Sequence, residues 1–167
     1  MESVKILKIY LPLILLGVVS RVIPHPANFT VMGGLAVWLG SKKNAPEVLI
    51  PILSMFVADL FLGFDSLFMR LVVYGSVGLM YLIGRMANKN LWLASITGSW
   101  VFFIVTNSGV FLTSTMYPKT LLGLTQCFYM ALPFWRNALL ADVIFTQVFH
   151  IAEKWLKNSA QVAIIDR

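Results

Sequence analysis

A series of apolar runs, separated by short polar connections, divides most of the chain. The runs cover about residues 6–20, 29–40, 46–63, 67–84, 91–112, 121–134 and 137–155. A helix needs about 20 apolar residues to cross the roughly 30 Å hydrocarbon core of a bilayer, because it rises about 1.5 Å per residue. The runs 29–40 and 121–134 are too short to span comfortably. The pattern predicts an all-α integral membrane protein.

The composition leads to the same fold class. The 167 residues are 59% hydrophobic and 12% charged, whereas soluble domains are nearer half apolar and a quarter charged. One small core cannot bury this much apolar surface, so lipid must cover the rest. The length allows one domain, which we place at 1–157, with 158–167 as a short cytoplasmic tail. The net charge is +6. The cations stand at the ends of apolar runs, a distribution that suits membrane orientation and not nucleic-acid binding.

Charge asymmetry decides whether the two short runs span. If 29–40 spans and 121–134 does not, nine cations share one side: Lys5, Lys8, Lys42, Lys43, Arg85, Lys89, Lys154, Lys157 and Arg167. Four share the other: Arg21, Arg70, Lys119 and Arg136. If both short runs span, the division is seven against six, and if neither spans it is five against eight with the N-terminus on the poorer side. We therefore predict six transmembrane helices, both termini cytoplasmic, and 121–134 as an outer half-helix or surface helix.

The N-terminal segment also fits a secretory signal peptide, because Lys5 and Lys8 precede an apolar stretch. Arg21 follows that stretch directly, the cleavage signal is poor, and further apolar runs follow. We expect a retained first helix.

The first outer connection, "RVIPHPANFT", is polar and rigid. Its prolines disfavour helix at the residues before them, and Asn28 or Thr30 can cap the next helix. It is either a stiff turn, with Arg21 reaching the headgroups, or a preformed rim over a pocket. In the second case Arg21, His25 and Asn28 supply hydrogen-bond donors.

Two further outer regions carry polar groups. Asp59 lies within the third span, where a carboxylate is costly, so it should face the bundle and have a partner. Asp65 and Arg70 lie in the following connection, either solvated or paired with each other. Asn107, near the end of the fifth span, can hydrogen-bond between helices.

The head of the last span is also polar. Thr120 can cap the half-helix, and Pro133 ends or kinks it. Arg136 and Asn137 stand at the head of the span, with Asp142 deeper. Two helix N-termini point into this region, and their free N–H groups favour an anionic or carbonyl group.

Polar groups from three distant segments thus share one side, which predicts a binding cavity open to the outside. The expected ligand-binding residues are Arg21, His25, Asn28, Asp59, Asn107, Tyr117, Trp135, Arg136, Asn137 and Asp142. The cations would orient a polar or anionic group, and Tyr117 and Trp135 would cover an apolar ring. We expect no cofactor and no metal; Cys127 is the one cysteine, a buried apolar thiol.

Two other classes remain open. An intramembrane enzyme would need Asp59 and Asp142 within shared-proton reach, and no zinc, nucleophile-elbow or P-loop motif is present. A non-transporting scaffold or subunit would pair its outer polar groups with one another and leave no cavity.

The strings "SRVIPHPANFTVMGGLAVWLG", "LSMFVADLFLGFDSLFMRLVVY" and "YPKTLLGLTQCFYMALPFWRNALLAD" resemble a bacterial family of small, uncharacterised membrane transport proteins. That family is in turn similar to the substrate-binding S components of energy-coupling factor (ECF) transporters. The resemblance covers about residues 18–150. It implies a six-helix fold in the bacterial inner membrane and a pocket near the outer face. It also implies a vitamin or cofactor precursor as ligand, and a membrane partner with two ATPases.

The first helix departs from that pattern. Many S components carry Ala-x-x-x-Ala there for docking to the membrane partner, whereas "ILKIYLPLILLGVVS" has only Gly17 and Ser20 as small residues. The protein either acts alone or docks through another face, such as Gly75, Gly78 and Gly84.

Overall fold

The computed structural model describes residues 2–42, 45–87 and 90–165, and every regular element in them is a helix. This confirms the all-α class. The elements are α1 (Glu2–Val22), α2 (Met32–Ser41), the 3-10 turn η1 (Ala45–Val48), α3 (Leu49–Leu62), α4 (Leu67–Met86), α5 (Leu91–Thr113) and α6 (Leu121–Ile165). Lys43, Lys89 and Arg167, which enter the charge count, lie outside the described residues.

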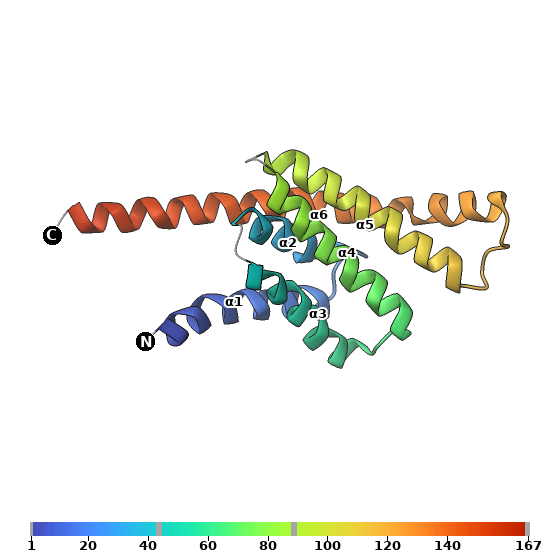
Figure 1. Cartoon of the computed structure of the whole chain (residues 1–167), viewed down its shortest axis with the longest axis horizontal. Coiled ribbons are helices and arrows are strands. Elements are labelled where there is room, and N and C mark those ends of the chain that lie inside the picture. The colour runs from blue at the N-terminus through green and yellow to red at the C-terminus, as the bar shows by residue number, and fades with distance from the viewer. Residues whose placement is uncertain (1, 43–44, 88–89, 166–167) are drawn as a thin grey trace.

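The short helix α2 forms the centre of the bundle. It packs against α4, α5 and α6, while α1 packs on α3 at one side (Figure 1). Leu35, Ala36 and Val37 are fully buried, and Leu39 is nearly so. A helix that is apolar on all sides must be enclosed, and the ten residues of α2 rise only about 15 Å, about half the thickness of the hydrocarbon core. Burial among longer neighbours therefore accounts for the short second run.

Glycines let α2 approach its neighbours closely. A Cβ at Gly84 of α4 would lie 2.8 Å from the carbonyl carbon of Val37, and one at Gly40 would lie 2.9 Å from that of Tyr81. A Cβ at Gly34 would lie 2.8 Å from the backbone nitrogen of Thr146 on α6. Side chains at these positions would force the helices apart. Gly84, suggested above as part of a docking face, is buried against α2.

The two ends of the bundle differ in what they carry. Both termini point toward one end, whereas the connections α1–α2, α3–α4 and α5–α6 lie toward the other (Figure 1). The connections at residues 21–30, 63–66 and 114–120 are those that the sequence groups together as polar. We call this end the loop end.

Helix caps follow the sequence at some starts and not at others. Ser66 accepts from the Met69 amide at the start of α4, and Asn90 accepts from the Leu93 amide at the start of α5. Thr120 accepts from the Gly123 amide, as expected. The expected cap of the second helix by Asn28 or Thr30 is wrong: Val31 precedes α2, with no side-chain cap bond.

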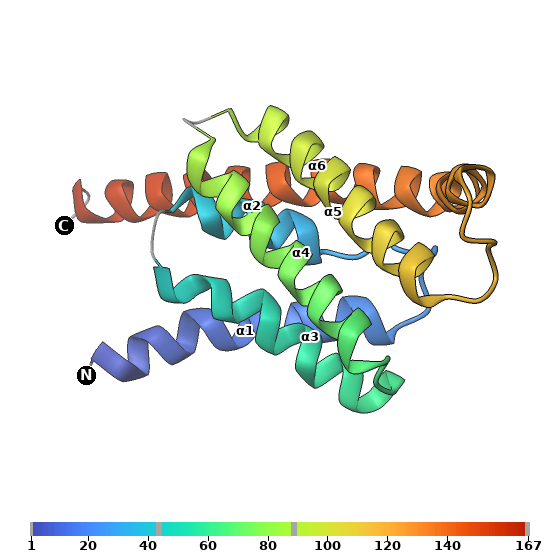
Figure 2. The same cartoon turned by 45° about the vertical axis from the view of Figure 1, so that its right-hand side comes forward.

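The expected separate half-helix 121–134 is also wrong, because α6 runs without interruption from Leu121 to Ile165 with Pro133 inside it. The helix is bent: Figure 2 shows its first turns end-on and the rest lying across the view. Proline lacks the amide donor and crowds the carbonyl one turn earlier, so it kinks a helix without having to end it. The helix also continues through the expected tail as far as Ile165.

Candidate ligand-binding cavity

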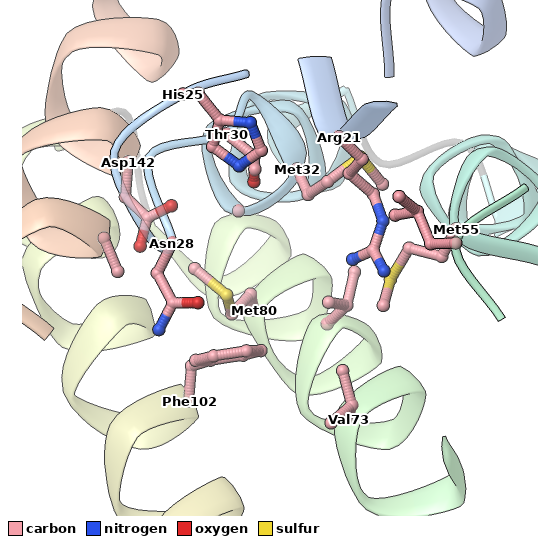
Figure 3. A pocket seen from close by; sticks show the side chains of 14 residues that line it. Arg21, His25, Asn28, Thr30, Met32, Met55, Val73, Met80, Phe102 and Asp142 are labelled. Carbon is pink, nitrogen blue, oxygen red and sulfur yellow. The ribbon is translucent and has the colours of Figure 1, made fainter. Parts of the chain in front are cut away.

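A cavity of about 250 Å³ lies within the bundle toward the loop end (Figure 3). Each of the six α-helices contributes to its wall, and so does the connection before α2. Its polar lining is Arg21, His25, Asn28, Thr30 and Asp142; its apolar lining includes Met32, Met55, Met80, Val73, Val77 and Phe102. A few convergent polar groups on a mostly apolar wall are typical of small-molecule sites. We call this space the inner cavity.

A second space of about 270 Å³, the aromatic cavity, adjoins the first. The two share five wall residues: Arg21, Asn28, Val73, Phe102 and Ala138. Phe103, Phe134, Trp135 and Asn107 line only the second. The Trp135 ring lies 4.1 Å from that of Trp100 and 5.5 Å from that of Phe103, measured between centroids. These contacts fix the indole in one position.

Arg21 and Asp59 form an ion pair that joins α1 to α3. The Arg21 guanidinium donates to Asp59 at 2.6 Å, and the Tyr74 hydroxyl of α4 donates to the other carboxylate oxygen at 2.6 Å. Asp59 is 8% exposed. The prediction that Asp59 faces the bundle and has a partner is confirmed, and the partners tie three helices together. Arg70 donates to the backbone oxygen of Asp65 at 3.1 Å and lies over the Phe64 ring.

Asp142 enters the inner cavity from α6, on the side opposite Arg21 (Figure 3). It is 6% exposed. Its polar neighbours are the Ser99 side chain and the Gly34 backbone. The ion pairs among the described residues join Arg21 to Asp59 and both Lys42 and Lys157 to Glu153, and none includes Asp142. Asp142 is thus a buried carboxylate beside a cavity, without a cationic partner in the described part of the chain.

The connection 23–31 closes the loop end of the inner cavity. Asn28 has φ 63°, a left-handed conformation that asparagine tolerates better than most residues. The Asn137 amide donates to Ala27 O at 3.1 Å, which fixes this connection to α6. His25 Nδ1 lies 2.7 Å from Ile23 O, so that nitrogen carries the proton.

Two buried donors on the cavity walls lack partners among the described residues: Arg21 Nε and Trp135 Nε1. A buried N–H without an acceptor costs about 1–3 kcal/mol, so such groups are uncommon in folded proteins unless water or a ligand satisfies them. Both residues line the aromatic cavity. The two side chains thus border this cavity, while the two nitrogen atoms themselves are enclosed by protein.

The remaining predicted site residues lie elsewhere. Tyr117 is half-buried and Arg136 is exposed, and neither lines the inner or the aromatic cavity. Asp59 and Asn137 also line neither cavity, although both bind residues at the cavity walls or the connection before α2.

Sequence reasoning missed the apolar wall, above all Met80 and Phe102, together with Tyr74. These residues sit in ordinary apolar runs, and only the packing of α4 and α5 reveals them.

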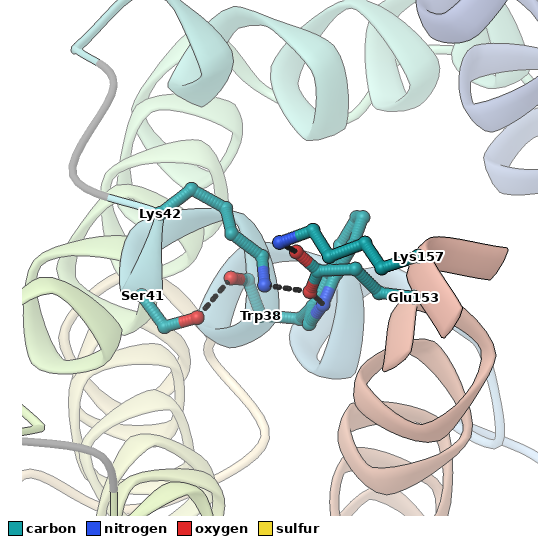
Figure 4. A network of polar contacts seen from close by, with 5 residues as sticks. All are labelled: Trp38, Ser41, Lys42, Glu153 and Lys157. Carbon is teal, nitrogen blue, oxygen red and sulfur yellow. Dashed lines mark hydrogen bonds and ion pairs between the residues drawn. The ribbon is translucent and has the colours of Figure 1, made fainter. Parts of the chain in front are cut away.

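The opposite end of the bundle carries a polar cluster that closes α2 against α6 (Figure 4). Lys42 pairs with Glu153, and Lys157 pairs with the same carboxylate at 2.7 Å. The Trp38 indole donates to Glu153 at 3.2 Å, and its ring stacks on Phe149. This cluster is satisfied internally and fixes the end of α2 far from the cavities.

Cys127 lies in the first part of α6, buried at 2% exposure. Its thiol is enclosed by neighbouring side chains, so reagents do not reach it while the protein is folded. The prediction of a buried thiol is confirmed.

Residues 2–163 match the model of a family of unknown function (DUF6580). The match spans most of the chain, so the protein belongs to this family. Neither a curated protein nor a solved structure shows significant similarity to the chain.

Proposed function

We propose that this protein is a six-span membrane component that binds a small polar metabolite near its outer face for uptake. It would work in the bacterial inner membrane with both termini in the cytoplasm. The ligand would be of the vitamin or cofactor-precursor class, in keeping with the resemblance to ECF S components. Its partner would be an ECF-type membrane subunit with ATPases, or it would act alone.

The outer surface of the bundle supports the membrane part. Of the described helices, α4 and α5 combine the length and apolar composition needed to cross a membrane. Large apolar side chains are also exposed on other helices, such as Phe61 on α3 at 72% and Leu121 on α6 at 80%. Water-soluble monomers rarely expose apolar surface so widely, whereas lipid covers it at no cost.

The observation that carries the binding part is the pair of adjoining cavities, on whose walls the polar side chains of Arg21, Asn28 and Asp142 converge. A scaffold that packs its helices fully against one another would leave no such space. A bound metabolite would fill it.

The enzyme alternative draws no support from the two aspartates. The Asp59 oxygens accept from Arg21 and Tyr74, while Asp142 lines the inner cavity beside Ser99. An aspartyl pair would need the two carboxylates to share a proton.

Native mass spectrometry of protein extracted in mild detergent tests the proposal. Ala138 is 7% exposed and lines both cavities, so Ala138→Phe fills them. Leu140 lies on the same helix and is 51% exposed, which makes Leu140→Phe the matched control. We expect a bound small molecule in the wild type and in Leu140→Phe, and its loss in Ala138→Phe. A wild type without any bound molecule, or equal occupancy in all three proteins, would contradict the proposal.

A further inference from the structure

We infer that the ligand carries a protonated amine, which Asp142 binds inside the inner cavity. The inference rests on the proposed binding function and adds the chemical class of the ligand. It assigns Asp142 as the anchor of the positive group.

The first argument is the state of Asp142. This carboxylate is 6% exposed and lies at the wall of an open cavity. A buried charge without a counter-charge is strongly disfavoured, and the described ion pairs leave Asp142 out. Ser99 and Gly34 are uncharged neighbours. A cation that enters the cavity would complete the pair.

The second argument is the state of Arg21, the cation that could have attracted an anion. Asp59 already balances its charge at 2.6 Å. Of the described charged side chains that line the inner cavity, Arg21 is thus already paired and Asp142 lacks a counter-charge. A cationic group can pair with Asp142, whereas a carboxylate or phosphate would meet an Arg21 that Asp59 already neutralises.

The third argument is the size of the space. The inner cavity holds about 250 Å³, many times the roughly 30 Å³ that one water occupies in the liquid. A bare proton or alkali ion would leave most of it empty. Phe102 lines the wall, and aromatic rings attract organic cations within about 6 Å. The space suits an organic amine.

The adjoining aromatic cavity indicates the rest of the ligand. Trp135 and Phe103 form apolar walls there. An amine whose other end is a flat ring fills both cavities at once. Asn28, which lines both cavities, stands at their junction.

Binding of two isosteric probes to the full-length protein in detergent tests the inference. The probes are 2-phenylethylamine, which is cationic at neutral pH, and 2-phenylethanol, which is neutral; 3-phenylpropanoate serves as the anionic probe. We expect the amine to bind the wild type most tightly, and Asp142→Asn to weaken it roughly 10–100-fold, as for loss of a charge-assisted hydrogen bond. The neutral probe should bind wild type and Asp142→Asn alike.

Glu153→Gln is the control, because it removes the same charge from the opposite end of the bundle and should leave amine binding unchanged. Asp142→Glu keeps the charge and should retain most of the affinity, which separates charge recognition from a folding defect. Equal binding of amine and alcohol, preference for the anion, or an unchanged Asp142→Asn would overturn the inference. A wild type that binds no amine, but carries another molecule that Ala138→Phe displaces, would also overturn the inference. In that case the proposed binding function stands.

Discussion

Two glycines on the same helix should respond in opposite ways to alanine. Gly84 faces α2, where a Cβ would lie 2.8 Å from the carbonyl carbon of Val37, whereas a Cβ at Gly75 meets no atom within 4 Å. Carbon atoms pack best at about 3.5–4.0 Å. Gly84→Ala therefore requires α2 and α4 to move apart by about 1 Å, and Gly75→Ala requires no movement.

The size of the effect follows from this overlap. Overpacking of this kind costs about 1–3 kcal/mol. A chain of this length loses about 2–4 °C in unfolding midpoint for each kcal/mol, so Gly84→Ala should lower the midpoint by roughly 2–12 °C. Gly75→Ala should leave the midpoint unchanged or raise it, because it restricts the unfolded chain by up to about 1 kcal/mol.

The chain contains its own reporter for this measurement. Cys127 is its one cysteine and is 2% exposed, so a thiol-reactive dye should label it only on unfolding. Heating both variants and the wild type in the same detergent with this dye gives the midpoints. Equal midpoints for Gly84→Ala and Gly75→Ala would refute the close approach of α2 and α4.

Three further outcomes follow from contacts at the loop end and from the orientation. Arg21→Met should cost about 3–5 kcal/mol, because it leaves buried Asp59 without its cation; the double variant Arg21→Met/Asp59→Leu should regain most of this in thermal unfolding. Full additivity of the two changes would argue against the pair. Asn28→Gly should unfold like the wild type, whereas Asn28→Val should cost about 1–2 kcal/mol at its left-handed φ; equal midpoints would contradict that backbone conformation. In a cysteine-free background, His25→Cys should react with an impermeant maleimide in intact cells, and Lys154→Cys only after permeabilisation. The reverse pattern would overturn the proposed orientation.

The pattern of apolar runs was enough to predict the helical class and the place of most helices. The apolar runs mark the helices. The prolines in residues 21–30 disfavour helix at the residues before them, which marks the connection before α2. The error at 121–134 has a physical cause: Pro133 removes one backbone hydrogen bond, which either ends or bends a helix. Only the neighbours that pack on α6 decide between these outcomes, and a single sequence does not contain that information.

The candidate site was predictable where ionisable residues interrupt apolar runs. Asp59 and Asp142 are acidic groups in apolar runs; Asp142 lines the inner cavity, and Asp59 is buried behind it as the partner of Arg21. Arg136 is equally unusual in the sequence, yet it is exposed. In a straight helix the period of about 3.6 residues predicts which face a residue occupies. Near a bend such as that of α6 this period no longer predicts the face. Apolar wall residues such as Met80 carry no signal at all in a chain so rich in them.

A crystal structure of protein extracted under mild conditions from the cells that make it tests the central claim most directly. We predict density for one small molecule that spans the two cavities, with an apolar part beside Trp135 and a nitrogen within ion-pair distance of the Asp142 carboxylate. Cavities closed by the protein's own side chains, with no small molecule in them, would contradict the account.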